Sequence, residues 1–246
     1  MTLDVSDQTA ARAELHDGWG ELILSRPDRR NALTGPMVEA LRAGLAKLHL
    51  GGARVVVLRG EGGALSSGLD LDAFAVQPAP AWRASWADDY AAFHSELYRS
   101  PAVIVGALER YAINGGASLA LACDLLVAGE GSFIVVGEAA LGMNAPMNVA
   151  WLRLRTSEAI AAQILFGADR FPAAELRRLG LVYKVVPDHE VVLQAHELAK
   201  RLAGFPGQGL AAIKDAMRRP PSGGDDVFDA VRSGSIATSA PSRLNL

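Results

Sequence analysis

A single cysteine, Cys123, is present among the 246 residues of the chain. One cysteine cannot form an intrachain disulfide, and its apolar neighbours favour a small buried side chain over a nucleophile. The histidines, at positions 16, 49, 94, 189 and 196, show no H-x-x-x-H or Cys/His spacing. The sequence therefore predicts no metal site, and its cysteine usage suits a reducing compartment.

Strong charge of either sign is also missing. The formal net charge is −3 and the lysines and arginines are scattered, so there is no electrostatic footprint for nucleic acid. The sequence contains no phosphate-binding G-x-x-x-x-G-K-[ST] loop and no G-x-S-x-G elbow. These absences argue against a P-loop nucleotide site and against a serine hydrolase triad.

The chain has no uninterrupted apolar run long enough for a membrane span. Its longest apolar stretch, residues 112–128, is broken by Asn114, Gly115, Gly116 and Asp124, which is typical of a buried helix and strand. The N-terminal sequence MTLDVSDQTAAR is polar and lacks the apolar core of a signal peptide. We expect a cytoplasmic protein without a membrane partner.

Hydrophobic residues make up 50% of the chain, so a large core is expected. Apolar strand-like runs alternate with stretches of helical period, which predicts an α/β fold with a core sheet. The expected strands cover residues 21–24, 54–58, 103–105, 125–127, 133–136 and 181–186. The expected helices begin near Pro36, near Trp86 and after Asn114, and then cover residues 157–166, 172–179, 188–202 and 209–218.

Two glycine-bearing junctions between a loop and a helix follow expected strands. Residues 66–70, SSGLD, come after the 54–58 strand, and residues 114–116, NGG, come after the 103–105 strand. Ligands of open α/β sheets gather beyond the carboxyl ends of strands, so one backbone N–H from each junction can converge on a carbonyl oxygen. Such an oxyanion hole stabilises developing negative charge. Glycine pairs before helices also serve tight packing, and the pattern alone leaves both interpretations open.

Glu138 is the candidate acid or base. It follows the 133–136 strand in the segment GEAALG, where no other residue is charged. A carboxylate in an apolar setting has a raised pKa, which suits a general base near neutral pH. The other interpretation is an ordinary loop glutamate that faces water.

The chain resembles the crotonase, or enoyl-CoA hydratase/isomerase, superfamily. The motifs are RPDRRNAL at 26–33, RVVVLRGEGGALSSGLDL at 54–71, INGGASLALACDLLVAG at 113–129, GEAALGM at 137–143 and AAELRRLGLVYKVVP at 173–187. The resemblance implies a ββα spiral core over residues 1–190, and a C-terminal helical region and polar tail over residues 191–246 that mediates trimer formation. It further implies an acyl-CoA thioester as partner, no cofactor besides the coenzyme A of the substrate, and a homotrimer or homohexamer.

The same resemblance assigns the site residues. Leu69 and Gly115 are implied as the two oxyanion-hole donors, and Glu138 as the catalytic carboxylate. The residues implied to contact the substrate are Arg29, Ala32, Ser66, Gly68, Leu69, Asp70, Leu71, Gly115, Gly116 and Leu141.

Ser118 is the departure that bears on the reaction. Hydratase-like members use two glutamates, and the first of these positions is Ser118 here, while the second is Glu138. A single glutamate at the second position is similar to the Δ3,Δ2-enoyl-CoA isomerase branch, so isomerisation is the first hypothesis. A hydratase-like enzyme with another enolate reaction and a non-catalytic acyl-CoA-binding protein are the alternatives. Glu109-Arg110 replaces the usual Asn-Gly turn, either as a second acid or as a surface ion pair.

Overall fold

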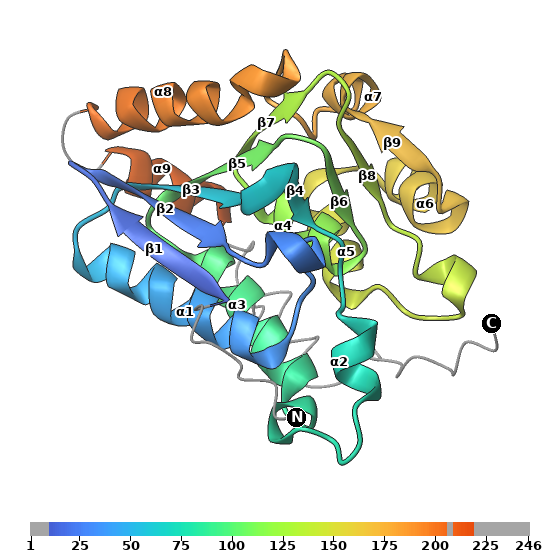
Figure 1. Ribbon diagram of the computed structural model, residues 1–246. Coiled ribbons are helices and arrows are strands. Elements are labelled where there is room, and N and C mark those ends of the chain that lie inside the picture. The colour runs from blue at the N-terminus through green and yellow to red at the C-terminus, as the bar shows by residue number, and fades with distance from the viewer. Residues whose placement is uncertain (1–9, 206–208, 219–246) are drawn as a thin grey trace.

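Strands of this chain form two β-sheets in a computed structural model that describes residues 10–205 and 209–218 (Figure 1). The larger sheet has the order β1-β2-β3-β5-β7-β10, with β1 antiparallel to β2 and every other pair parallel. Its strands are β1 (Ala11–Leu15), β2 (Trp19–Leu24), β3 (Val55–Gly60), β5 (Val103–Leu108), β7 (Leu125–Gly129) and β10 (Lys184–Val186).

The smaller sheet has the order β4-β6-β8-β9, and β9 is its antiparallel member. Its strands are β4 (Ala64–Ser66), β6 (Tyr111–Ile113), β8 (Phe133–Val135) and β9 (Arg170–Pro172). Along the chain, β3, β5 and β7 enter the larger sheet, and each is followed within a few residues by β4, β6 or β8 in the smaller one. Helices then lead to the next pair of strands, so the chain forms a spiral of ββα units. Equivalent strands of successive units lie side by side and run parallel.

The helices of the described residues connect these strands and pack against the sheets. They are α1 (Gly35–Leu50), α2 (Leu71–Ala75), α3 (Trp86–Arg99), α4 (Gly115–Ala122), α5 (Pro146–Arg155), α6 (Glu158–Gly167), α7 (Ala173–Arg178), α8 (Val191–Ala203) and α9 (Gly209–Arg218). The α1 helix starts as its sequence predicts, with Pro36 in the first turn and the Thr34 side chain accepting a hydrogen bond from the Met37 N–H.

Both faces of the larger sheet are buried, which explains why its central strands are continuously apolar. On β3, Val56 and Leu58 belong to the main core together with α1, α3 and α4. Val55 and Val57 point to the opposite face, where the apolar side of α8 covers them. Figure 1 shows α8 along one side of this sheet and α1 along the other.

Most expected helices and long strands are present, but four short strands were missed: β1, β4, β6 and β9. The last three have three residues each, too few to show a period of two. Pairing with neighbours, rather than local sequence, makes them strands. No helix among the described residues is both long and apolar enough to cross a membrane.

Candidate active site

The two glycine junctions lie side by side because the strands before them are paired. The junction at 66–70 follows β4 and the junction at 114–116 follows β6, so neither directly follows the strand expected from sequence. β4 and β6 run parallel, with Ser66 opposite Ala112. Their carboxyl ends therefore deliver both junctions to one edge of the smaller sheet.

Glycine is required at this edge for close approach. Gly68 has a φ of +86°, and a Cβ added there would lie 2.8 Å from the Ile113 carbonyl oxygen and 3.5 Å from the Gly115 nitrogen. A Cβ on Gly116 would overlap the carbonyl oxygen of Ser66. Tight packing therefore accounts for these glycines, and it is also what brings the two backbones together.

The backbone N–H groups of Leu69 and Gly115, the expected oxyanion donors, form no hydrogen bond within the described residues. Leu33 forms an isolated parallel bridge with Leu69, in which the Leu33 N–H donates to Gly68 O (2.7 Å) and the Asp70 N–H donates to Leu33 O (3.0 Å). This pattern turns the N–H of Leu69 away from Leu33. Gly115 is the first residue of α4, and neither its N–H nor that of Leu69 has a partner within residues 10–205 and 209–218.

Glu138 is buried, so it is a carboxyl group in an apolar setting and not a loop glutamate that faces water. It follows β8, its exposed fraction is 7%, and its Oε1 accepts a hydrogen bond from Asn148 Nδ2 at 3.1 Å. Its Oε2 has no hydrogen-bond partner within the described residues. Burial raises the pKa of Glu138 to about 7. A carboxyl group with this pKa can both take up and release a proton near neutral pH.

Glu138 is tied to the second glycine junction through Asn114. The Gly137 N–H donates to Asn114 Oδ1 at 2.8 Å, and Asn148 Nδ2 donates to Asn114 O at 3.1 Å. The Asn114 carbonyl belongs to the same peptide group as the Gly115 N–H. The buried carboxyl group and one expected oxyanion donor are therefore held by the same polar side chains.

Ser118 is fully buried inside α4 and takes part in a packed polar network. Its Oγ lies 2.7 Å from Gly115 O, 2.9 Å from the Tyr90 hydroxyl and 3.2 Å from His94 Nε2. Trp151 Nε1 donates to His94 Nδ1 at 2.9 Å, which leaves the proton of the neutral imidazole on Nε2, facing Ser118. Burial lowers the pKa of His94 to about 3, so this ring is neutral.

Ser118, at the centre of this network, is the position that the family resemblance assigns to the first glutamate of a hydratase-like member. The Tyr90 hydroxyl closes the network by donating to Gly115 O at 2.6 Å. From sequence, none of Tyr90, His94, Asn148 and Trp151 was assigned to the site. Of these, Asn148 had a usable signal, because it is a lone amide in the apolar segment PMNVAWL.

Three residues that the sequence predicts to contact the substrate lie around the start of α2: Asp70 precedes it, Leu71 is its first residue, and Arg29 reaches it from the 27–29 turn. Asp70 caps α2 by accepting from the Ala73 N–H at 3.1 Å, and it pairs with Arg26 at 3.0 Å and Arg29 at 3.2 Å. Although burial alone would raise the pKa of Asp70, these bonds lower it. Arg29 also pairs with the exposed Asp72 at 2.7 Å, while Leu71 is exposed.

The remaining expected contact residues are less uniform. Ser66 is buried and donates to Asn31 O at 2.8 Å, so its hydroxyl serves the loop itself. Ala32, which precedes Leu33, is buried, and Leu141 is half-buried in the turn after Glu138. Glu109 is half-buried between β5 and β6 and burial raises its pKa. The expected ion pair between Glu109 and Arg110 is absent from the described part of the chain.

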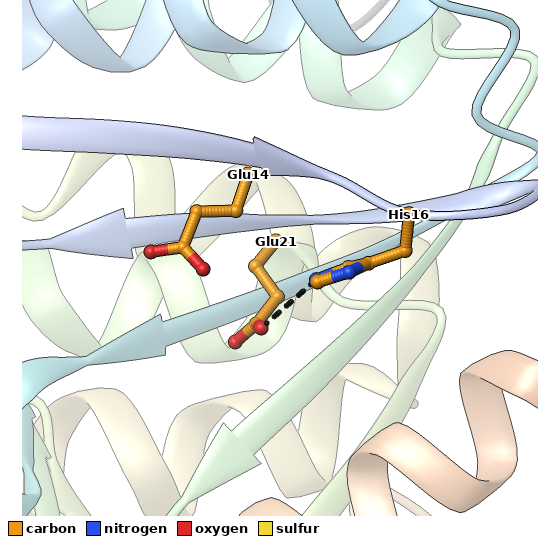
Figure 2. Close-up of side chains that lie close together, drawn as sticks. All are labelled: Glu14, His16 and Glu21. Carbon is orange, nitrogen blue, oxygen red and sulfur yellow. Dashed lines mark hydrogen bonds and ion pairs between the residues drawn. The ribbon is translucent and has the colours of Figure 1, made fainter.

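A second polar cluster lies at the β1–β2 hairpin (Figure 2), on different elements from the glycine junctions. The register places Glu14 opposite Glu21, and ligand atoms of Glu14, His16 and Glu21 all lie within 4.8 Å of one another. Histidine spacing could not reveal this cluster. Its acids already face cations: Arg59 Nε is 2.5 Å from Glu21, and Arg12 Nε is 2.8 Å from Glu14.

A spiral of ββα units with paired glycine junctions and a buried glutamate defines a protein of the crotonase fold. The sequence model described as enoyl-CoA hydratase/isomerase matches residues 14–226, and the chain belongs to this family. A relative in Rhodobacter capsulatus, described as a probable enoyl-CoA hydratase, is 30% identical over 206 residues, covering 83% of this chain and 79% of the relative.

Solved structures agree with this assignment. An enoyl-CoA isomerase from Mycobacterium tuberculosis is 26% identical with a TM-score of 0.77, covering 92% of this chain and 96% of the other. An enoyl-CoA hydratase from Mycobacterium avium subsp. paratuberculosis has a TM-score of 0.81 at 23% identity, covering 94% and 93% of the two chains, and shows the fold alone. The predicted α/β crotonase fold is confirmed.

Proposed function

We propose that this protein isomerises a 3-enoyl-CoA to the conjugated 2-enoyl-CoA, with Glu138 as its single acid–base group. The observation that carries the proposal is one buried carboxyl group, with a pKa of about 7, which Asn148 links to the peptide group that carries the Gly115 N–H. The family supplies the substrate class, an acyl-CoA thioester.

The reaction needs one proton carrier and a site for negative charge. Glu138 removes a proton from C2, and the electrons of that C–H bond form the C2=C3 bond in the product. The thioester oxygen carries the charge of the dienolate between the N–H groups of Leu69 and Gly115. The C3=C4 electron pair then takes the proton back from Glu138 at C4, so no atom is gained or lost.

Hydration of a 2-enoyl-CoA is the second candidate, because relatives are described as enoyl-CoA hydratases. In the two-glutamate mechanism, hydration needs a second carboxylate to activate water. Ser118 cannot be a base at neutral pH, and Tyr90 and His94 fill the space around its hydroxyl. These contacts favour isomerisation over hydration.

The proposal is tested by offering purified protein a 3-enoyl-CoA and, separately, a 2-enoyl-CoA. We expect conjugation of the 3-enoyl-CoA, loss of that activity by at least about a hundredfold in Glu138→Gln, and little water addition to the 2-enoyl-CoA. Glu130→Gln, at an exposed turn between β7 and β8, is the matched control and keeps the activity.

Three results contradict the proposal. Undiminished isomerisation by Glu138→Gln removes Glu138 from the mechanism, and faster hydration than isomerisation by the wild type favours the hydratase. Binding of acyl-CoA without turnover of either substrate favours the non-catalytic alternative. We also propose that the protein assembles as a homotrimer or homohexamer, which mass photometry measures directly.

A further inference from the structure

Asn148 connects the two halves of the proposed site. It lies in the first turn of α5 and is 1% exposed. Its Nδ2 donates to Glu138 Oε1 and to Asn114 O, both at 3.1 Å. When Glu138 is ionised, both partners are oxygens that can only accept hydrogen bonds. The opposite orientation of the Asn148 amide would place its Oδ1 against these oxygens, where no hydrogen bond can form. The orientation of Asn148 is therefore fixed by its neighbours.

The bond to Asn114 O acts on the oxyanion hole. This carbonyl also accepts from the Ser118 N–H at 3.2 Å, and its peptide group carries the N–H of Gly115. Hydrogen bonds that a peptide carbonyl accepts polarise the N–H of the same peptide and make it a stronger donor. Asn148 thus strengthens the Gly115 N–H without touching the substrate.

The bond to Glu138 acts on the base. A neutral amide donor stabilises the ionised carboxyl group in a place where burial disfavours it. The other carboxyl oxygen, Oε2, has no hydrogen-bond partner within the described residues. Among the residues that the structure describes, no other group therefore holds the proton that Glu138 takes up and releases.

We propose that Asn148 is a positioning residue that couples the base to the oxyanion hole, through one amide group that serves Glu138 and the Gly115 peptide together. Its kinetic consequence rests on the proposed function, but its effect on Glu138 and on the Gly115 amide does not. The proposal is therefore tested first on the protein without substrate.

The test compares wild type with Asn148→Leu, which has a similar volume and no donor. Infrared difference spectra against the matching Glu138→Gln proteins isolate the titration of the Glu138 carboxyl group. We expect its midpoint to rise by about one pH unit, which is a tenfold smaller ionised fraction below the midpoint. The Gly115 amide proton is expected to shift upfield in NMR spectra, because its peptide is less polarised. Met147→Leu, a buried neighbour that leaves Asn148 in place, is the control and changes neither signal.

An unchanged titration midpoint and Gly115 signal in folded Asn148→Leu overturn the proposal. If that variant does not fold, Asn148→Ser, which keeps one donor, is measured in its place and is expected to show at least one of the two shifts. Failure of the proposed function has a different signature: the two spectroscopic shifts occur while no 3-enoyl-CoA is turned over by the wild type. Where isomerisation occurs, the kcat/KM profile of Asn148→Leu moves to higher pH together with the carboxyl midpoint.

Discussion

Glu138 and Glu21 are both buried glutamates whose pKa values move in opposite directions. Burial raises the pKa of Glu138 to about 7, because one amide is its only side-chain donor among the described residues. Burial alone would also raise the pKa of Glu21, but hydrogen bonds and charge from His196 and Arg59 lower it to about 2. The contrast separates a carboxyl group able to exchange protons near neutral pH from one fixed in the ionised form.

The raised pKa of Glu138 predicts a stability cost at high pH. The unfolded chain releases this proton near the usual value of 4.5, whereas the folded protein keeps it until about 7. Between these values the folded state binds more protons, so stability falls as the pH rises, by on the order of 3 kcal/mol in total. Glu138→Gln carries no charge and is expected to be more stable than wild type by roughly 2–3 kcal/mol at about pH 8.

Guanidinium unfolding at two pH values checks this expectation. The advantage of Glu138→Gln shrinks toward zero at about pH 4, where the wild-type carboxyl group is protonated in both states. Equal stability of the two proteins at the higher pH would mean that Glu138 is not desolvated. The Glu130→Gln control, at an exposed position, is expected to show no such pH dependence.

At the scale of the element, α4 carries the close contact between the two junctions. A Cβ on Gly116 would overlap the Ser66 carbonyl oxygen, whereas a Cβ on Gly115 would lie 3.0 Å from Leu33 Cδ1, the end of a side chain. We expect Gly116→Ala to destabilise the protein by about 1–3 kcal/mol through this overlap, and Gly115→Ala by less. Alanine favours helix over glycine at both positions, so this propensity cancels in the comparison.

Thermal unfolding of the two variants is the measurement for this pair. Greater loss of stability in Gly115→Ala than in Gly116→Ala would show that the approach of β4 to α4 is not the limiting contact.

The pairing of Ser66 with Ala112 shows what the sequence could not predict about these junctions. Local sequence indicates the glycines, but only the parallel pairing of β4 and β6 explains why their loops meet.

At the scale of the whole molecule, periodicity predicts the long elements and cannot predict the spiral. The run 54–58 reads as a buried strand because Val55 and Val57 face α8 while Val56 and Leu58 face the main core. The spiral depends on three-residue strands such as β4, and the motifs of the family, not the period, predicted it. The cluster of Glu14 and Glu21 likewise depends on strand register, which sequence spacing does not contain.

The sequence predicted the candidate acid and the two candidate N–H donors of the site, but not the side chains that hold them in place. Leu69, Gly115 and Glu138 stand in recognisable motifs, so sequence was sufficient to select them. Asn148 and Tyr90 come from helices far along the chain from the residues they contact, and only folding brings them together. The sequence also singled out Ser118, but only the structure shows the buried hydrogen bonds that its hydroxyl forms.

The central claim is that one carboxyl group, Glu138, carries the same proton from C2 to C4. The most direct measurement is turnover of a 3-enoyl-CoA labelled with deuterium at C2, followed by analysis of the product by mass spectrometry and NMR. Because Glu138 is buried, the account predicts product with deuterium transferred to C4 in a substantial fraction of turnovers. Product that carries only solvent hydrogen at C4, or Glu138→Gln that transfers the label as fast as wild type, would contradict it.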